Sequence, residues 1–230
     1  QVTADVNGRR APVDTGPVVR PNGAAGRVHL SPEALGDEEF RREYGVRYAY
    51  VAGGMERGIA SEALVVRMAN AGLLSFFGAK GLPLERIEQA IRSIQRELPP
   101  GKTFGVNVFG PSALGTSEKE TLAACESLGV TVVEASFYLR PSEALVKYRL
   151  RGLSEGGQGK VVCKHRVLAK VNLPEVAELF MRPPAPELVG ALRSAGAISA
   201  RQAELARSVP VADDVCVVGD SGWYTEQRMA

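Results

Sequence analysis

Two adjacent glycines, Gly53 and Gly54, stand where an apolar run meets a helical pattern. The run 48–52 precedes them, and apolar side chains recur at helical spacing after Ser61. This order predicts a buried strand, a glycine turn and a helix. Because a strand that ends in glycines lets a flat ligand lie close to the backbone, the turn is a candidate binding site. A similar pattern returns at 73–79, where Gly78 follows a second apolar run.

Polar residues follow later apolar runs in the same way. Asn107 lies near the end of one run, and Lys170 lies within another, 167–171. A lysine that faces inward from a buried strand needs an anionic partner. Each residue also has an ordinary explanation, since Asn107 could cap a turn and Lys170 could lie on an exposed edge strand. In a closed parallel barrel, by contrast, strand ends converge on one face, where active sites lie.

Apolar runs and helical patterns alternate along the chain. We predict strands at 48–53, 73–77, 104–109, 130–135, 161–163 with a continuation to 171 after a break, and 214–218. Helices are expected at 61–71, 84–97, 117–127, 141–151, 173–181, 185–194 and 199–206. The alternation predicts an α/β fold with a parallel sheet. Since no dinucleotide-binding glycine fingerprint is present, a TIM (β/α)8-type barrel is favoured over an open doubly wound sheet.

Composition excludes several classes of protein. The chain has 230 residues, of which 45% are hydrophobic, and its net charge of +2 is too small to indicate nucleic-acid binding. No apolar run is long enough to span a membrane, and no signal peptide is visible. Only His29 and His165 are available as imidazole ligands, so no metal site is predicted.

The three cysteines, Cys125, Cys163 and Cys216, are too few and too far apart for a disulfide framework, which favours a reducing cytoplasm. Residues 1–27 are polar and rich in Gly, Pro, Arg and Asn, so we expect a flexible N-terminal arm. The folded domain is expected to occupy 28–230.

The segment 45–55 and the residues Gly58 to Glu62 resemble the trans-acting enoyl reductases of polyketide and polyunsaturated fatty acid synthesis. Further segments that match in order are 72–79, 84–88, 133–136, 145–153, 168–171, 174–177, 211–214 and 220–222. The resemblance implies an FMN-binding TIM barrel related to nitronate monooxygenases. It also implies that NADPH is used to reduce an α,β-unsaturated acyl group on an acyl carrier protein.

The resemblance implies a role for each candidate residue. Gly53, Gly54 and Met55 would line the isoalloxazine, with Gly78 beside them. Asn107 would hydrogen-bond the polar edge of the flavin, and Lys170 would place a cation near its N1–C2 carbonyl side. The pocket would be closed by Asp220, Ser221 and Gly222.

This sequence departs from the family pattern near its end. The family has a Gly-Gly-His-Thr stretch after Asp220-Ser221, whereas Trp223 and Tyr224 stand here. Tyr224 could donate the Cα proton, or it could be a packed aromatic residue that replaces a catalytic group. The family also continues through two further strands that supply much of the FMN phosphate site. We therefore expect about six of the eight βα units here. Either the rest is supplied by missing residues or another polypeptide, or the fold closes differently; a homodimer is a separate expectation.

Other functions stay open at this point. One is a flavin oxidase of the nitronate monooxygenase type, and another is a non-catalytic homologue that binds a carrier protein. Cys163 and His165 could form a nucleophile and base. The cluster Cys163-Lys164-His165-Arg166 is better interpreted as positive charge for an acidic carrier protein or a cofactor phosphate. A basic patch for the acidic carrier protein, or simply a solvated helix, is expected at Arg140, Lys147, Arg149 and Arg151.

Overall fold

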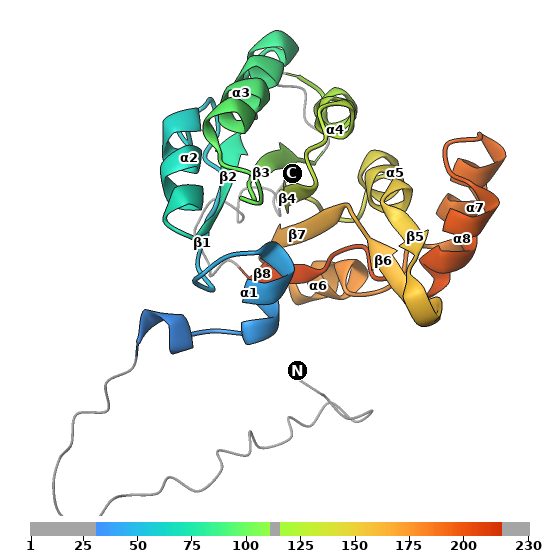
Figure 1. Cartoon of the computed structure of the whole chain (residues 1–230). Coiled ribbons are helices and arrows are strands. Elements are labelled where there is room, and N and C mark those ends of the chain that lie inside the picture. The colour runs from blue at the N-terminus through green and yellow to red at the C-terminus, as the bar shows by residue number, and fades with distance from the viewer. Residues whose placement is uncertain (1–30, 111–115, 218–230) are drawn as a thin grey trace, which may run out of the picture. The chain divides into compact units, whose positions relative to one another are not determined.

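The protein is described by a computed structural model that covers residues 31–110 and 116–217. Six parallel strands form one curled sheet, in the spatial order β1-β2-β3-β4-β7-β8 (Figure 1). Their bounds are Val51–Ala52, Leu74–Gly78, Gly105–Phe109, Val132–Ser136, Arg166–Val171 and Asp214–Val217. The sheet and its helices make a partial TIM barrel, which confirms the predicted architecture.

The first α-helix precedes the first strand, and the other helices lie between successive strands of this sheet. In chain order they are α1 (Glu38–Tyr44), α2 (Glu62–Asn70), α3 (Leu84–Glu97), α4 (Glu118–Ser127), α5 (Glu143–Arg151), α6 (Pro174–Phe180), α7 (Pro186–Ser194) and α8 (Ala200–Leu205). Short 3-10 helices lie at Pro32–Ala34, Gly157–Gly159 and Ala206–Ser208. Only α1 among the α-helices was not predicted from the sequence, because its single buried residue, Tyr44, leaves no apolar stripe.

Serine caps set the starts of four helices. The hydroxyl oxygens of Ser61, Ser117, Ser142 and Ser199 each accept a hydrogen bond from a backbone N–H in the first turn. At Ser117 and Ser199, a side chain three residues later bonds back to the cap and completes a capping box. Such a cap contributes about 1 kcal/mol, and its local nature explains why these boundaries could be read from the sequence.

The outer face of the sheet packs against the helices. Val106, Val133 and Val167 are fully buried there, in one cluster with Ile87 and Ile91 of α3. The helical spacing of the α3 residues turns one apolar face toward the strands and leaves its charged face to solvent. This two-layer packing forms the main core.

A second cluster lies on the concave inner face. Leu74, Phe76, Val132 and Leu168 pack there with Tyr44 of α1, which closes the amino end of the strands. A side chain at Gly105 is excluded because its Cβ would lie 2.3 Å from Cδ1 of Phe76. The inner face is therefore apolar toward the amino ends of the strands, and its polar residues lie beyond, toward the carboxyl ends.

The segment between α5 and β7 forms an antiparallel hairpin rather than a barrel strand. Its strands are β5 (Leu153–Glu155) and β6 (Val161–Cys163), which pair only with each other. The strand conformation is interrupted by a bend at 164–165 before β7 begins. The predicted strand 161–163 and its continuation after a break are thus separate elements, of which only the second joins the sheet.

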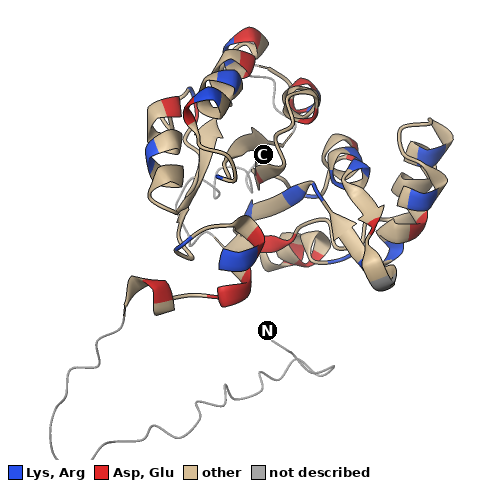
Figure 2. Cartoon of the chain, viewed as in Figure 1, with Lys and Arg blue, Asp and Glu red and all other residues tan. Residues whose placement is uncertain are grey.

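Charged residues of both signs alternate over the helices that cover the sheet (Figure 2). Within residues 31–110 and 116–217, none of the helices is long and apolar enough to cross a bilayer.

Candidate active site

The turn after β1 packs against Asn107 of β3 and Glu134 of β4 on the inner face of the sheet. The Gly54 N–H donates a hydrogen bond to Glu134 Oε2 at 2.8 Å. A Cβ on Gly54 would lie 2.1 Å from Asn107 Cβ, and a Cβ on Gly53 would lie 2.9 Å from Glu134 Oε1. Both positions therefore require glycine because of contacts within the protein itself.

Gly78 fixes the other side of the same turn. A Cβ on Gly78 would lie 1.5 Å from the carbonyl oxygen of Met55, so no side chain fits between β2 and the turn. The Gly78 N–H donates to Ala60 O at 3.1 Å, and its carbonyl accepts from the Gly58 N–H at 2.9 Å. The turn is thus held by backbone bonds while the Met55 side chain is 45% exposed.

A buried polar network lies beneath the turn. Asn107, Glu134 and Ser136 are 1%, 1% and 2% exposed. Asn107 Nδ2 donates to Glu134 Oε2 and, at 2.9 Å, to Ser136 Oγ. Asn107 Oδ1 is buried and has no hydrogen-bond partner in the part of the chain that the structure describes. An unsatisfied buried acceptor is costly, so this atom is the clearest sign of a ligand.

Lys170 supplies the positive charge near this network. It lies on β7 in register with Ser136 of β4, and its Nζ is 3.3 Å from the point that a Cβ on Gly53 would occupy. Burial raises the pKa of the Glu134 carboxyl, and the charge of Lys170 and the donors Gly54 N–H and Asn107 Nδ2 partly offset that rise. The predicted inward lysine therefore has an acidic neighbour.

Two aromatic rings and a lysine extend the site along the strand ends. Phe109 and Phe137 stack with ring centroids 4.8 Å apart, and Lys80 Nζ lies 4.3 Å from the centroid of Phe109. Phe137 has a left-handed backbone, with φ of 60°. Such a conformation costs of order 1–3 kcal/mol in a bulky residue and is most often found at functional sites.

Most of the predicted site residues come together here. Gly53, Gly54, Met55, Gly78, Asn107 and Lys170 all lie around Glu134 at the carboxyl ends of the strands. Asp220, Ser221, Gly222 and Tyr224 lie outside the described residues. Glu134 itself was not predicted as a site residue, although its sequence signal is plain: it is the single charge in the apolar run 130–135.

No protein-family model matches this chain. The polyketide biosynthesis protein PksE of Bacillus subtilis is 40% identical over 201 residues, which are 87% of this chain and 26% of PksE. The polyketide biosynthesis protein ThaF of Burkholderia thailandensis is 45% identical over 84% of this chain and 16% of its own length. A polyunsaturated fatty acid synthase polypeptide of a Thraustochytrium species is 41% identical, over 84% of this chain and 13% of that polypeptide. The chain therefore spans about a quarter or less of these relatives.

A solved structure adds a related domain. The enoyl reductase domain of MlnA, from the macrolactin biosynthesis cluster of Bacillus amyloliquefaciens, matches with a TM-score of 0.78 and 38% identity, over 81% of this chain and 43% of that one. The chain is thus a homologue of these synthase proteins and of an enoyl reductase domain, and it resembles the trans-acting enoyl reductases.

In this enoyl reductase homologue, Cys163 and His165 do not form a nucleophile and base. The Cys163 thiol donates to the backbone carbonyl of His165 at 3.1 Å, and His165 Nδ1 lies 2.6 Å from Tyr148 O. The imidazole also stacks on the Tyr148 ring, with centroids 4.4 Å apart. Burial lowers the pKa of His165, so the positive charge expected of the segment 163–166 rests on Lys164 and Arg166.

Arg149 was wrongly expected in a basic surface patch, because its side chain is buried. It pairs with Asp213 through two hydrogen bonds of 2.6 and 3.0 Å, and it also donates to the carbonyls of His165 and Pro210. Arg151 pairs with Glu126 instead of standing free. The helical periodicity of α5 places Arg149 on the buried face of the helix. The clustering of basic residues in the sequence does not show which of them face inward.

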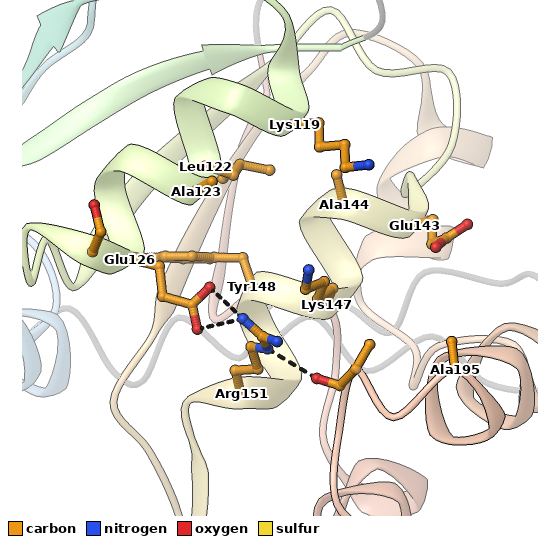
Figure 3. Close-up of a pocket in the computed structure, with 12 residues that line it drawn as sticks. Lys119, Leu122, Ala123, Glu126, Glu143, Ala144, Lys147, Tyr148, Arg151 and Ala195 are labelled. Carbon is orange, nitrogen blue, oxygen red and sulfur yellow. Dashed lines mark hydrogen bonds and ion pairs between the residues drawn. The ribbon is translucent and has the colours of Figure 1, made fainter. Parts of the chain in front are cut away.

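A cavity of about 750 Å³ lies between α4 and α5, away from the strand ends (Figure 3). The side chains of Lys119, Lys147 and Tyr148 line it, and Arg151 crosses its edge with hydrogen bonds to Glu126 and the Ala197 carbonyl. It borders the outer faces of helices and shares no residue with the Asn107 network. The cavity and the Asn107 network are therefore two separate candidate sites.

Proposed function

We propose that this chain forms part of an FMN-dependent enoyl reductase that reduces an α,β-unsaturated acyl thioester with NADPH. Two observations support the proposal. The chain is 38% identical to an enoyl reductase domain over 81% of its length, and its polar network lies at the carboxyl ends of parallel strands, where barrel enzymes bind their substrates.

The single observation that carries the assignment of the cofactor is the unpartnered Asn107 Oδ1. An acceptor at this position fits the imide N–H of an isoalloxazine ring. Lys170 adds a positive charge close by, which suits the carbonyl side of the same ring. The backbone at Gly53, Gly54 and Met55 would cover the ring, with Gly78 holding this turn in place.

The chemistry divides between the cofactor and the chain. When bound, FMN supplies the carrier that passes a hydride from NADPH to the β-carbon of the substrate. Lys170 would place a positive charge beside the carbonyl edge of the bound ring, and Asn107 would orient the ring by a hydrogen bond. We assign the remaining step, proton donation to Cα, to the Tyr224 phenol. Asp220, Ser221 and Gly222 would close the pocket beside it.

The proton-donor role of Tyr224 has a direct test. In Tyr224→Phe, reduction of the enoyl thioester should slow while reduction of bound flavin by NADPH keeps its rate. Equal rates of enoyl reduction in both proteins would remove Tyr224 from the mechanism.

We further propose that the acyl substrate is carried by an acyl carrier protein in the cytoplasm. The relatives are named as polyketide biosynthesis proteins and as part of a polyunsaturated fatty acid synthase, which supports a carrier-bound substrate. All three cysteines are free thiols, which suits a reducing compartment. The remaining barrel strands would come from a longer form of this polypeptide or from another polypeptide, and a homodimer is proposed separately.

An absorbance spectrum of the purified chain tests the assignment of the cofactor. Flavin bands, with FMN released on denaturation, are the expected result. Enoyl reduction is then measured with NADPH and an acyl-carrier-protein thioester, and oxygen uptake without that substrate distinguishes an oxidase. A colourless chain that takes up no added FMN contradicts the proposal for this chain.

A further inference from the structure

Glu134 is a buried carboxylate of the site to which the proposed reaction gives no role. It lies in the middle of β4, 1% exposed, and its Oε2 atom contacts two donors from different elements. One is the Gly54 N–H of the turn after β1, and the other is the Asn107 amide of β3. Burying a carboxylate costs free energy, so a structural or functional role for Glu134 must offset that cost.

The two contacts decide which way the Asn107 amide faces. A backbone N–H can only donate, so Glu134 Oε2 accepts from Gly54, and in the ionised carboxylate this oxygen has no proton to donate to Asn107. Asn107 must therefore present its NH2 group to the same oxygen. Ser136 Oγ could not impose this choice, because a hydroxyl both donates and accepts. With the NH2 group committed to Glu134, Oδ1 is left facing away as the unpartnered acceptor.

We propose that Glu134 is a positioning residue that locks the Asn107 amide so that the site presents an acceptor, and so selects a flavin edge that carries an N–H donor. This deepens the proposed function and rests on it. If the amide were free to turn, NH2 and carbonyl oxygen would exchange places and the site would lose its preference for a donor. Glu134 acts through Asn107 and needs no contact with the ring itself.

The test compares two ligands on each variant: FMN and FMN methylated at N3, which lacks the donor. Wild-type chain should bind FMN about 10- to 100-fold more tightly than the methylated form, the range expected for a buried acceptor left unsatisfied. Glu134→Met removes the acceptor, and this ratio should fall to within about threefold of one. Glu134→Gln retains a carbonyl oxygen for both donors and should restore the ratio.

Glu126→Met, the same substitution at the cavity of Figure 3, is the matched control and should leave the ratio unchanged. Equal ratios in wild type and Glu134→Met would overturn the inference. If Glu134→Met does not fold, Asn107→Leu tests the same acceptor, and an undiminished ratio there also overturns it.

A measurement without flavin separates this inference from the proposed function. The side-chain NH2 protons of Asn107, assigned by their absence in Asn107→Leu, should exchange slowly in wild type and Glu134→Gln. They should exchange at least about tenfold faster in Glu134→Met, because an amide released from a buried bond opens more often. Unchanged exchange in Glu134→Met overturns the positioning role. A wild-type chain that shows the slow exchange but binds no FMN supports the positioning role and contradicts the proposed cofactor.

Discussion

At the scale of single residues, Glu134 and Lys170 are coupled through charge. Burial raises the pKa of the Glu134 carboxyl, and Lys170 opposes this rise. A carboxyl whose pKa is raised on folding contributes stability that is present below its unfolded pKa and is lost as pH rises through its folded pKa. The charge of Lys170 therefore favours the ionised form of Glu134 against the effect of burial.

We therefore expect Lys170→Met to raise the pKa of Glu134 further. The free energy of unfolding should differ little between wild type and Lys170→Met at acid pH, where Glu134 is protonated in both. The variant should become progressively less stable than wild type as pH rises toward neutral. Urea unfolding over a pH series measures this, and the pH-dependent difference should vanish when Glu134→Gln is added to both. A constant difference across the series would show that the two charges are not coupled.

Gly78 permits a second prediction at the residue scale. Gly78→Ala would place a Cβ 1.5 Å from the Met55 carbonyl oxygen, so the turn over the site must shift. We expect a loss of about 1–3 kcal/mol of stability from overpacking. The control is Gly190→Ala in α7, where the added Cβ meets nothing within 4 Å. That change should stabilise the chain by about 0.5–1 kcal/mol, because alanine is the better helix former. Thermal melting that ranks the variants in the opposite order would refute the packing argument.

At the scale of elements, Arg149 joins α5 to the two last strands of the described sheet. Its guanidinium bonds Asp213 before β8 and the carbonyl of His165 before β7, and Asp213 also accepts from the Val167 N–H at 2.9 Å. The Arg149 and Asp213 side chains are 3% and 14% exposed. Losing Arg149 would leave Asp213 with only the more distant Arg166, whose Nη1 lies 3.6 Å from Asp213 Oδ1, and losing Asp213 would leave the Arg149 charge buried.

Arg149→Met should accordingly cost about 3–5 kcal/mol of unfolding free energy. Arg151→Met, two residues along the same helix, removes a pair with Glu126 whose side chains are 35% and 29% exposed. That change should cost no more than about 1 kcal/mol. Urea denaturation of the two variants checks the contrast, and equal losses would mean that burial does not set the strength of these pairs.

At the scale of the whole molecule, two regions compete as the binding site for the cofactor. The cavity between α4 and α5 measures about 750 Å³, whereas the network at the strand ends is compact and polar. Parallel barrels bind ligands at the carboxyl ends of their strands, since polar groups from many strands converge there. The unpartnered Asn107 Oδ1 lies at that end.

Charge reversal distinguishes the two regions. Lys170→Glu should weaken FMN binding at least about tenfold, by replacing a favourable charge with a repulsive one. The double variant Lys119→Glu, Lys147→Glu alters the lining of the α4–α5 cavity and should leave FMN affinity within about threefold of wild type. Fluorescence titration with FMN measures both, and loss of binding in the double variant alone would move the site to the helices.

The sequence alone determined most of the elements of this protein and six of its candidate site residues. Helix 84–97 and the strand runs follow from periodicity, and the serine caps follow from local hydrogen bonding, so both were readable from short stretches. The glycine turn and Lys170 were also identified, because strand order alone brings parallel strand ends to one edge.

Only the tertiary structure decided which buried charges have partners. Arg149 and Asp213 are 64 residues apart in the sequence, so no local pattern predicts that they form a pair. Glu134 accepts a hydrogen bond from Gly54, which is 80 residues away in the sequence. The sequence shows a carboxylate in an apolar run, but it does not show this contact. Burial, the direction of an amide and the pairing of a charge depend on contacts between distant elements, which the fold alone creates.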